Sequence, residues 1–197
     1  RAEIAGNILL TARPTLVPAE RYTSAAFARL EVDRMWPKVW QVACTVDHVA
    51  EPGDYFEYRC GPYSVLVVRG DDGALRAFQN VCRHRGNSLC AGTGGDLREL
   101  KCGYHGWTWD LAGALKRVPN RKGFGALSMA EFPLLAVKVD VWERLVFVNL
   151  DVDAMPLAQL RRLRLGGCEP LAQGRRLTLG TLPHFCRLGL GGHELLG

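Results

Sequence analysis

Two short segments near the middle of the chain each contain one cysteine and one histidine. The first is Cys82-x-His84 and the second, after seventeen intervening residues, is Cys102-x-x-His105. Thiolates and imidazoles are ligands for transition metals. A zinc finger usually takes two cysteines from one turn and two histidines from another, because it holds a single tetrahedral ion. Here each segment supplies one ligand of each kind, which favours a two-metal group with chemically different ends.

That division suits a Rieske-type [2Fe–2S] cluster, in which two cysteines hold one iron and two histidines hold the other. Cys82 and Cys102 would bind one iron as thiolates, and His84 and His105 would bind the second as imidazoles. The sequence therefore predicts these four residues as the metal- and cofactor-binding residues.

Small and charged residues around the four ligands fit such a cluster. Three glycines would let backbone N–H groups approach the cluster sulfurs, namely Gly86, Gly103 and Gly106. Arg83 and Arg85 flank His84. Positive charge at that position favours the reduced and more negative state of a cluster.

The segments "CRHRG" and "CGYHGWTWD" resemble those of the N-terminal domain of ring-hydroxylating oxygenase α subunits. The resemblance runs from about Tyr22 to Leu150 and implies a Rieske fold, a small antiparallel β-structure with two cluster-binding loops at one end. It also implies that the chain accepts electrons from a flavin- or ferredoxin-type reductase and passes them to a mononuclear non-haem iron. Full-length members of the family are expected to be homo-oligomers.

Respiratory Rieske proteins resemble the same pattern but carry one further cysteine in each loop. The corresponding positions here are Asn87 and Tyr104. This difference favours the oxygenases, and it predicts a potential toward the lower part of the Rieske window of roughly −150 to +300 mV.

Short β-type segments must position the two loops. Gly70-Asp71-Asp72-Gly73 predicts a hairpin turn between two of them, and the alternation in "VKVDVW" places Val137, Val139 and Val141 on one face. Many short strands without intervening helices predict a mainly β fold, a small antiparallel sandwich or barrel. The predicted strand segments are "VWQVACT", "DYFEYR", "YSVLVVR", "ALRAFQN", "LLAVKVDVW" and "LVFVNL".

The chain divides into three parts on sequence pattern. Residues 1–36 are an arm and one short helix, because "YTSAAFARLEVDRMW" has Ser and Thr at its start and Pro37 stops it. Residues 37–150 form the predicted Rieske domain. Residues 151–197 are an irregular tail of unknown structure, since 11 Leu, 8 Gly and 6 Arg fill 25 of the 38 positions from 160 onward without a period.

A catalytic domain with a facial triad of two histidines and one carboxylate is expected to be absent. Only His48, His184 and His193 remain once the cluster ligands are set aside, and their spacing does not form a triad. We therefore expect a shortened α subunit that resembles an oxidoreductase, without catalytic residues of its own.

Composition excludes several classes of protein. The chain has 48% hydrophobic residues and no apolar run near the ~18 residues that a membrane span needs, which predicts a soluble protein. The net charge of +5 is mild and its basic residues are scattered, which disfavours nucleic-acid binding. Seven cysteines is an odd number for a disulfide framework, so reduced thiols and a cytoplasmic location are expected.

Two alternative functions stay open on the sequence. A stand-alone Rieske ferredoxin would share the cluster, although it would not need the helix at 23–36 or the closing "VFVNLD". A zinc-binding structural or interaction domain would use the same four ligands without colour or redox activity.

Removal of the tail tests the domain division. A variant shortened to residues 1–153 is expected to keep its cluster and a thermal midpoint within a few degrees of the full chain, because unpatterned apolar residues do not offset the ~1–2 kcal/mol per residue of ordering entropy. Thermal unfolding and visible absorption measure the two properties. A large loss of cluster or of thermal stability would instead make the tail part of the fold.

Overall fold

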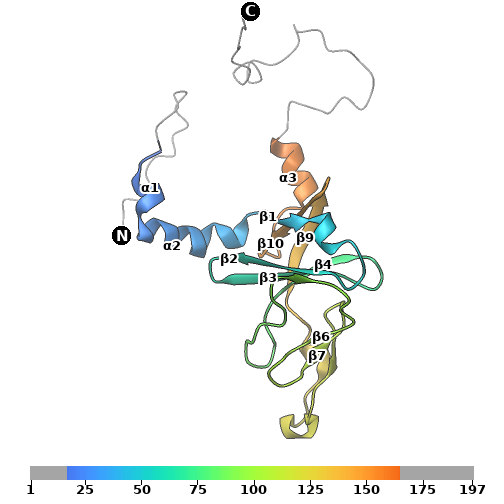
Figure 1. The fold of residues 1–197 in the computed structure, drawn as a ribbon. Coiled ribbons are helices and arrows are strands. Elements are labelled where there is room, and N and C mark those ends of the chain that lie inside the picture. Colours follow the sequence, from blue (N-terminus) through green and yellow to red (C-terminus); the bar gives the residue numbers. More distant parts are fainter. Residues whose placement is uncertain (1–16, 165–197) are drawn as a thin grey trace, which may run out of the picture. The chain divides into compact units, whose positions relative to one another are not determined.

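A computed structural model describes residues 17–164 (Figure 1). The chain divides into two units after Ala154. The described part of the second unit is helix α3 (Leu157–Arg164), which begins directly after Pro156. This helix lies in the tail that was expected to be irregular, and its eight residues are too few for a helical period to stand out in the sequence. No helix in residues 17–164 is long and apolar enough to cross a membrane.

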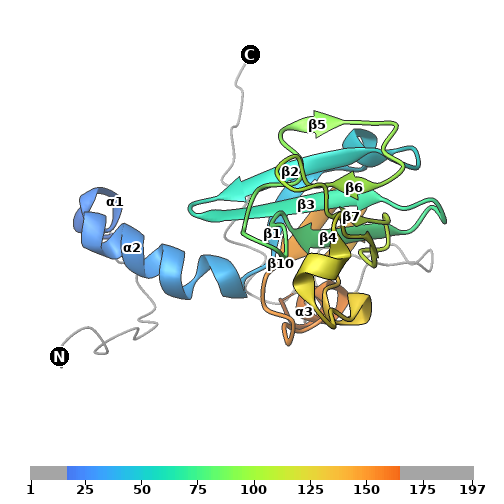
Figure 2. The ribbon, with the colours of Figure 1, turned by 90° about the horizontal axis from the view of Figure 1, so that it is seen from below.

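Strands form two antiparallel sheets in the first unit (Figures 1 and 2). The large sheet has the order β1-β10-β9-β4-β3-β2-β5, and the small sheet has the order β6-β7-β8. The large sheet contains β1 (Gln41–Thr45), β2 (Tyr55–Cys60), β3 (Tyr63–Arg69), β4 (Leu75–Gln79), β5 (Thr93–Gly94), β9 (Ala136–Trp142) and β10 (Leu145–Asn149). The small sheet contains β6 (Leu100–Lys101), β7 (Thr108–Trp109) and β8 (Leu115–Arg117).

The mainly β fold predicted from sequence is confirmed, and each of the six predicted strand segments overlaps one observed strand. Strands β5 to β8 were not predicted, because two or three residues are too few to show alternation. The helical segments of the first unit are α1 (Glu20–Thr23), α2 (Ala25–Arg34) and the 3₁₀ turns η1 (Trp36–Lys38), η2 (Val46–Val49), η3 (Arg121–Phe124) and η4 (Met129–Glu131).

Helix α2 is the predicted N-terminal helix. The side chain of Ser24 caps it by accepting a hydrogen bond from the backbone N–H of Phe27 at 3.3 Å. Pro37 follows in η1, where the chain leaves the helix. The hydroxyl of Tyr63 in β3 donates to the backbone carbonyl of Val32 at 3.4 Å, which ties α2 to the large sheet.

Strand β3 is buried on both faces and separates two cores. Val65 and Val67 point to one face, Leu66 and Val68 point to the other, and all four side chains are buried. The first core packs β3 and β4 against β10 and β9, with Val146 contributing from β10. The second core joins the large sheet to the small sheet and includes both cysteines of the predicted cluster. Its members are Leu66, Val68, Phe78, Cys82, Leu100, Cys102, Trp107, Trp109, Leu111, Leu115, Val118 and Leu134.

The alternating face predicted for β9 is only partly in the core. Val137 and Val139 pack in the core beside β10, as expected. Val141 is 41% exposed, because this core ends before the last residues of the strand. The alternation of residues therefore predicted which face of β9 points to the core. It did not predict how far along the strand that face is buried.

A buried asparagine joins the end of β4 to the chain that follows the first predicted cluster loop. The Oδ1 atom of Asn80 accepts from the backbone N–H groups of Leu89 and Cys90 at 3.0 and 3.2 Å. Its Nδ2 atom donates to the carbonyl of Cys90 at 2.7 Å and to the hydroxyl of Ser64 at 3.0 Å. One side chain thus holds this segment against β3 and β4.

Glu57 on β2 completes this network. Its carboxylate accepts from the Ser64 hydroxyl at 2.7 Å, from the Asn80 amide at 3.3 Å and from the backbone N–H of Gly92 at 3.0 Å. The Ser64 hydrogen bond is the main reason why the pKa of Glu57 lies below its ordinary value; burial opposes the shift, and the Gly92 N–H, the Arg59 charge and the Asn80 amide add to it. Only 8% of the Glu57 side chain is exposed, so little solvent screens these contacts.

Replacing Glu57 with glutamine is expected to lower the free energy of unfolding at pH 7 by about 1.5 to 3 kcal/mol, the usual range for hydrogen bonds to a charged group. A lowered folded-state pKa stabilises the fold above the unfolded-state pKa, and this stabilisation is lost as pH falls through the folded-state pKa. The gap between wild type and variant should therefore narrow below the ordinary glutamate pKa of about 4.3.

Denaturant unfolding between pH 3 and 7 measures this gap, and the exposed Glu51→Gln variant is the control. A gap that stays constant over this range would show that the charge of Glu57 does not contribute.

Candidate metal centre

The two predicted cluster loops, residues 82–87 and residues 102–107, are closed by the same pair of backbone hydrogen bonds. In each loop the cysteine N–H donates to the carbonyl five residues later, at 2.7 Å for Cys82 to Asn87 and 2.8 Å for Cys102 to Trp107. In each loop the N–H of the glycine four residues later donates back to the cysteine carbonyl at 3.0 Å. The two loops are thus matched in backbone structure, although their histidines stand at different positions.

Both closures depend on a glycine. Gly86 has φ 76° and Gly106 has φ 71°, in the left-handed region that side chains rarely adopt. At Gly106 a Cβ atom would also lie 3.2 Å from the Pro119 ring. Gly103, predicted to have a similar role, is not among the residues with positive φ.

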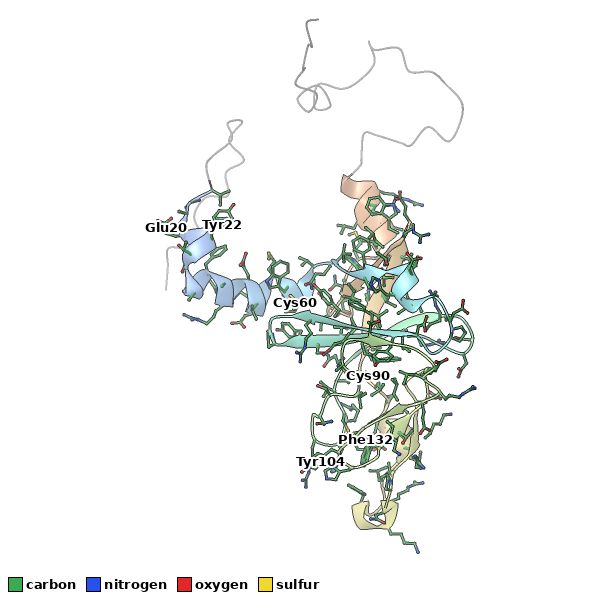
Figure 3. The ribbon with its side chains drawn as sticks, in the orientation of Figure 1. Glu20, Tyr22, Cys60, Cys90, Tyr104 and Phe132 are labelled. Atoms are coloured by element: carbon green, nitrogen blue, oxygen red, sulfur yellow. The ribbon has the colours of Figure 1, made fainter. Side chains whose placement is uncertain are left out.

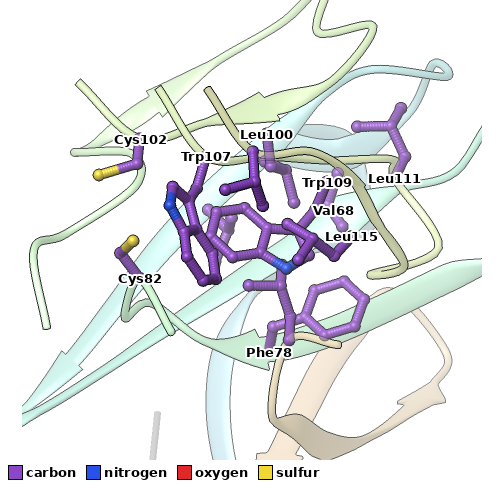
Figure 4. Packing of buried hydrophobic residues seen from close by; sticks show 12 residues of the cluster. Val68, Phe78, Cys82, Leu100, Cys102, Trp107, Trp109, Leu111 and Leu115 are labelled. Carbon is purple, nitrogen blue, oxygen red and sulfur yellow. The ribbon is translucent and has the colours of Figure 1, made fainter. Parts of the chain in front are cut away.

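Cys82 and Cys102 are buried side by side in the second core (Figure 4). Burial is the main reason why the pKa of Cys82 is raised; the backbone N–H groups of His84 and Arg85 oppose it. Burial also acts to raise the pKa of Cys102, but hydrogen bonds from the backbone N–H groups of its own loop, from Cys82 and from the Asn87 amide lower it overall. Both cysteines belong to one cluster of buried side chains, and their sulfurs lie on neighbouring loops in Figure 4, as ligands of one metal group would.

His84 and His105 form the second pair. Their ring centroids are 4.6 Å apart with the planes at 67°, and both side chains are half-buried. The Tyr104 ring lies 3.8 Å from that of His105 and is 62% exposed, at the small-sheet end of the unit (Figure 3). The sulfur pair therefore lies inside the domain, and the imidazole pair lies toward its surface.

The side chains of this site fit a Rieske cluster. The Nδ1 atom of His84 is buried and has no hydrogen-bond partner among residues 17–164. A buried ring nitrogen normally has a partner, and an iron ion would provide one. Burial is also the main reason why the pKa of His84 is lowered, with the charges of His105 and Arg85 adding to it; this direction favours the neutral imidazole that a metal binds.

Within residues 17–164, no three His, Cys, Asp or Glu side chains converge as a site for one ion. The four predicted residues instead form one cysteine pair and one histidine pair, as a two-iron group requires. Cys90 lies outside both pairs, and burial raises its pKa to about 11. His184 and His193 lie outside the described residues.

Sequence reasoning missed two polar side chains at the site. Asn87 was taken only as the place of an absent cysteine, yet its amide Nδ2 donates to the Cys102 sulfur at 3.9 Å. Asn80 anchors the chain beyond the first loop and was not singled out. Its place directly after the apolar strand segment "ALRAFQ" was the available indication, since a buried polar side chain at a strand end needs partners.

Comparison with known proteins agrees with this geometry. The Rieske [2Fe-2S] domain model matches residues 39–139. The α subunit of benzene 1,2-dioxygenase from Pseudomonas putida is 36% identical over 137 residues, which are 69% of this chain and 30% of that protein. Chloroplastic choline monooxygenase from Atriplex hortensis is 34% identical over 151 residues, or 77% of this chain and 34% of that protein.

The fold is also similar to that of a solved oxygenase. Naphthalene 1,2-dioxygenase from Rhodococcus sp., bound to indole, matches with a TM-score of 0.69 and 29% identity, over 77% of this chain and 34% of that chain. The chain spans about a third of the length of the curated relatives it matches. It belongs to the Rieske [2Fe-2S] domain family, with a Rieske-type [2Fe–2S] cluster as its cofactor, and it is related to the α subunits of ring-hydroxylating dioxygenases.

Proposed function

We propose that the domain transfers single electrons through a cluster bound by Cys82, Cys102, His84 and His105. The observation that carries this proposal is the pairing of two buried, neighbouring cysteines with two adjacent imidazoles, one of which has a buried Nδ1 without a hydrogen-bond partner among residues 17–164. When bound, the cluster accepts and releases one electron without leaving the protein.

The side chains divide this task between holding the cluster and exposing it. The buried cysteines would hold one iron away from water, and the backbone N–H groups of their loops would stabilise the thiolates. His84 and His105 would hold the other iron nearer the surface, beside the exposed rings of Tyr104 and Phe124. The histidine side is therefore where a redox partner would come closest to the cluster.

We further propose a flavin- or ferredoxin-type reductase as electron donor and a mononuclear non-haem iron as acceptor. Relationship to dioxygenase α subunits supports this assignment. Under this proposal, the acceptor iron is bound by the part of dioxygenase α subunits that this chain does not span. The complete proteins are proposed to be homo-oligomers. The free cysteines of the described residues support a reducing, cytoplasmic location; they are Cys44, Cys60, Cys82, Cys90 and Cys102.

Ligand variants test the assignment of the four residues. Anaerobically reconstituted wild type is expected to be red-brown and, after reduction with dithionite, to give a rhombic EPR spectrum with a low average g value. The Cys82→Ser and His84→Ala variants should lose most or all of this EPR signal, because each substitution removes one of the two protein ligands proposed for one iron.

Cys90→Ser is the matched control, because Cys90 is a partly buried thiol outside the two pairs and its loss should leave the spectrum unchanged. Stoichiometric zinc without visible absorption would identify a structural zinc domain instead.

Reduction by a protein donor tests the proposed direction of electron flow. Oxidised protein mixed anaerobically with NADH and a dioxygenase-type flavin reductase, with or without its ferredoxin, is expected to take up one electron per cluster. Bleaching of visible absorption follows this reaction, and omission of the reductase is the control. Full reduction by dithionite with none by the protein donors would refute the reductase assignment and leave the cluster assignment standing.

A further inference from the structure

Trp107 has a buried N–H group that nothing in the described part of the chain satisfies. The side chain is 2% exposed, and its Nε1 atom has no hydrogen-bond partner among residues 17–164. Leaving a buried donor unpaired costs about 1–3 kcal/mol, and most buried polar groups in folded proteins are therefore paired. This donor requires a partner that residues 17–164 do not supply.

The neighbouring Trp109 shows that the same core pairs an indole when it can. Trp109 is 0% exposed, and its Nε1 donates to the carbonyl of Phe132 at 2.8 Å. The two indoles lie 6.2 Å apart in one cluster of side chains. The difference between them is therefore the direction of the N–H group and not the depth of burial.

Packing fixes that direction. The Trp107 ring stacks on His84 with a 5.2 Å centroid distance and a 5° interplanar angle, and Phe124 and Phe132 contact it edge-on at 5.6 and 5.7 Å. Rotation of the indole toward another acceptor would break these contacts. In Figure 4 the Trp107 nitrogen lies on the side of the ring that faces Cys82 and Cys102.

The matched closure of the two loops supplies a second argument. Asn87 and Trp107 are the equivalent residues, each five positions after its cysteine, and each carries a side-chain N–H donor. The Asn87 amide already donates to the sulfur of Cys102, which belongs to the opposite loop. The indole N–H at the equivalent position of the second loop is the donor that still lacks a sulfur partner.

We propose that the Trp107 indole N–H donates a hydrogen bond to a sulfur atom of the bound cluster or of its cysteine ligands, and so raises the reduction potential. This inference rests on the cluster proposed above. A donor directed at sulfur stabilises the reduced state more, because that state carries more negative charge. Trp107 is thus a tuning residue as well as part of the core.

Trp107→Phe tests the proposal because it keeps an aromatic ring on His84 and removes the N–H group. At a fixed electrode potential, the ratio of reduced to oxidised cluster is expected to fall about three- to tenfold; a tenfold change corresponds to a midpoint 59 mV lower for one electron. Spectroelectrochemical titration of the reconstituted protein measures the midpoint.

Trp109→Phe is the matched control. It removes an equally buried indole N–H, but one bonded to a backbone carbonyl, so it should lower the thermal midpoint and leave the reduction potential within about 10 mV, a shift of less than twofold in the same ratio. Equal shifts in both variants would mean that the potential responds to loosened packing, and the proposal would be wrong.

A second measurement leaves Trp107 unchanged, so it tests the proposal even if the Trp107→Phe variant does not fold. The protein is expressed in cells supplied with ¹⁵N-indole, so that the indole nitrogen of each tryptophan is labelled. After reduction of the cluster, pulsed EPR should show a hyperfine coupling between the cluster and ¹⁵N. The coupling should persist in Trp109→Phe. A normal cluster signal without this coupling would overturn the inference and leave the proposed function intact, whereas absence of the cluster itself would refute the proposed function.

Discussion

The site depends on holding two buried thiols and two imidazoles together on loops that contain little regular structure. Backbone N–H and C=O groups in a buried loop lack the regular partners that a sheet provides. Each group that stays unpaired lowers the stability of the fold by about 1–3 kcal/mol. The matched closures at Cys82 and Cys102 meet this requirement within each loop. Asn80 meets it beyond the first loop, where its side chain pairs the backbone of Leu89 and Cys90. Internal hydrogen bonding therefore does in the loops what sheet pairing does elsewhere in the domain.

The two cores have separate roles that follow from the double burial of β3. The core on the side of Val65 and Val67 contains only side chains of the large sheet and its neighbouring turns, and it stabilises the scaffold. The core on the side of Leu66 and Val68 contains both cysteines and both central tryptophans. A change in packing at this second core therefore reaches the two proposed cysteine ligands directly, whereas β3 separates the first core from them.

Much of the fold could be predicted because its strands carry apolar runs or alternation long enough to recognise. β3 and β9 are of this kind, whereas β5 and β6 contain two residues each and owe their conformation to their neighbours. The four proposed ligands were identified from residue type and spacing alone. The roles of Asn87 and Trp107 could not be found in this way, because an asparagine or a tryptophan near a cysteine has no fixed partner until the chain is folded.

Relatives of this domain include a benzene dioxygenase α subunit and a choline monooxygenase, whose names describe very different substrates. In both cases the similarity covers the domain to which the Rieske family belongs, and about a third of the relative's length. What can differ from one such domain to another is the environment of the sulfurs, because N–H donors and nearby charge set the potential. Here Asn87 occupies a position where respiratory Rieske proteins carry a cysteine, and it donates to Cys102. The amide of Asn87 thus places a hydrogen-bond donor beside a proposed ligand sulfur, where it would act on the charge of that sulfur.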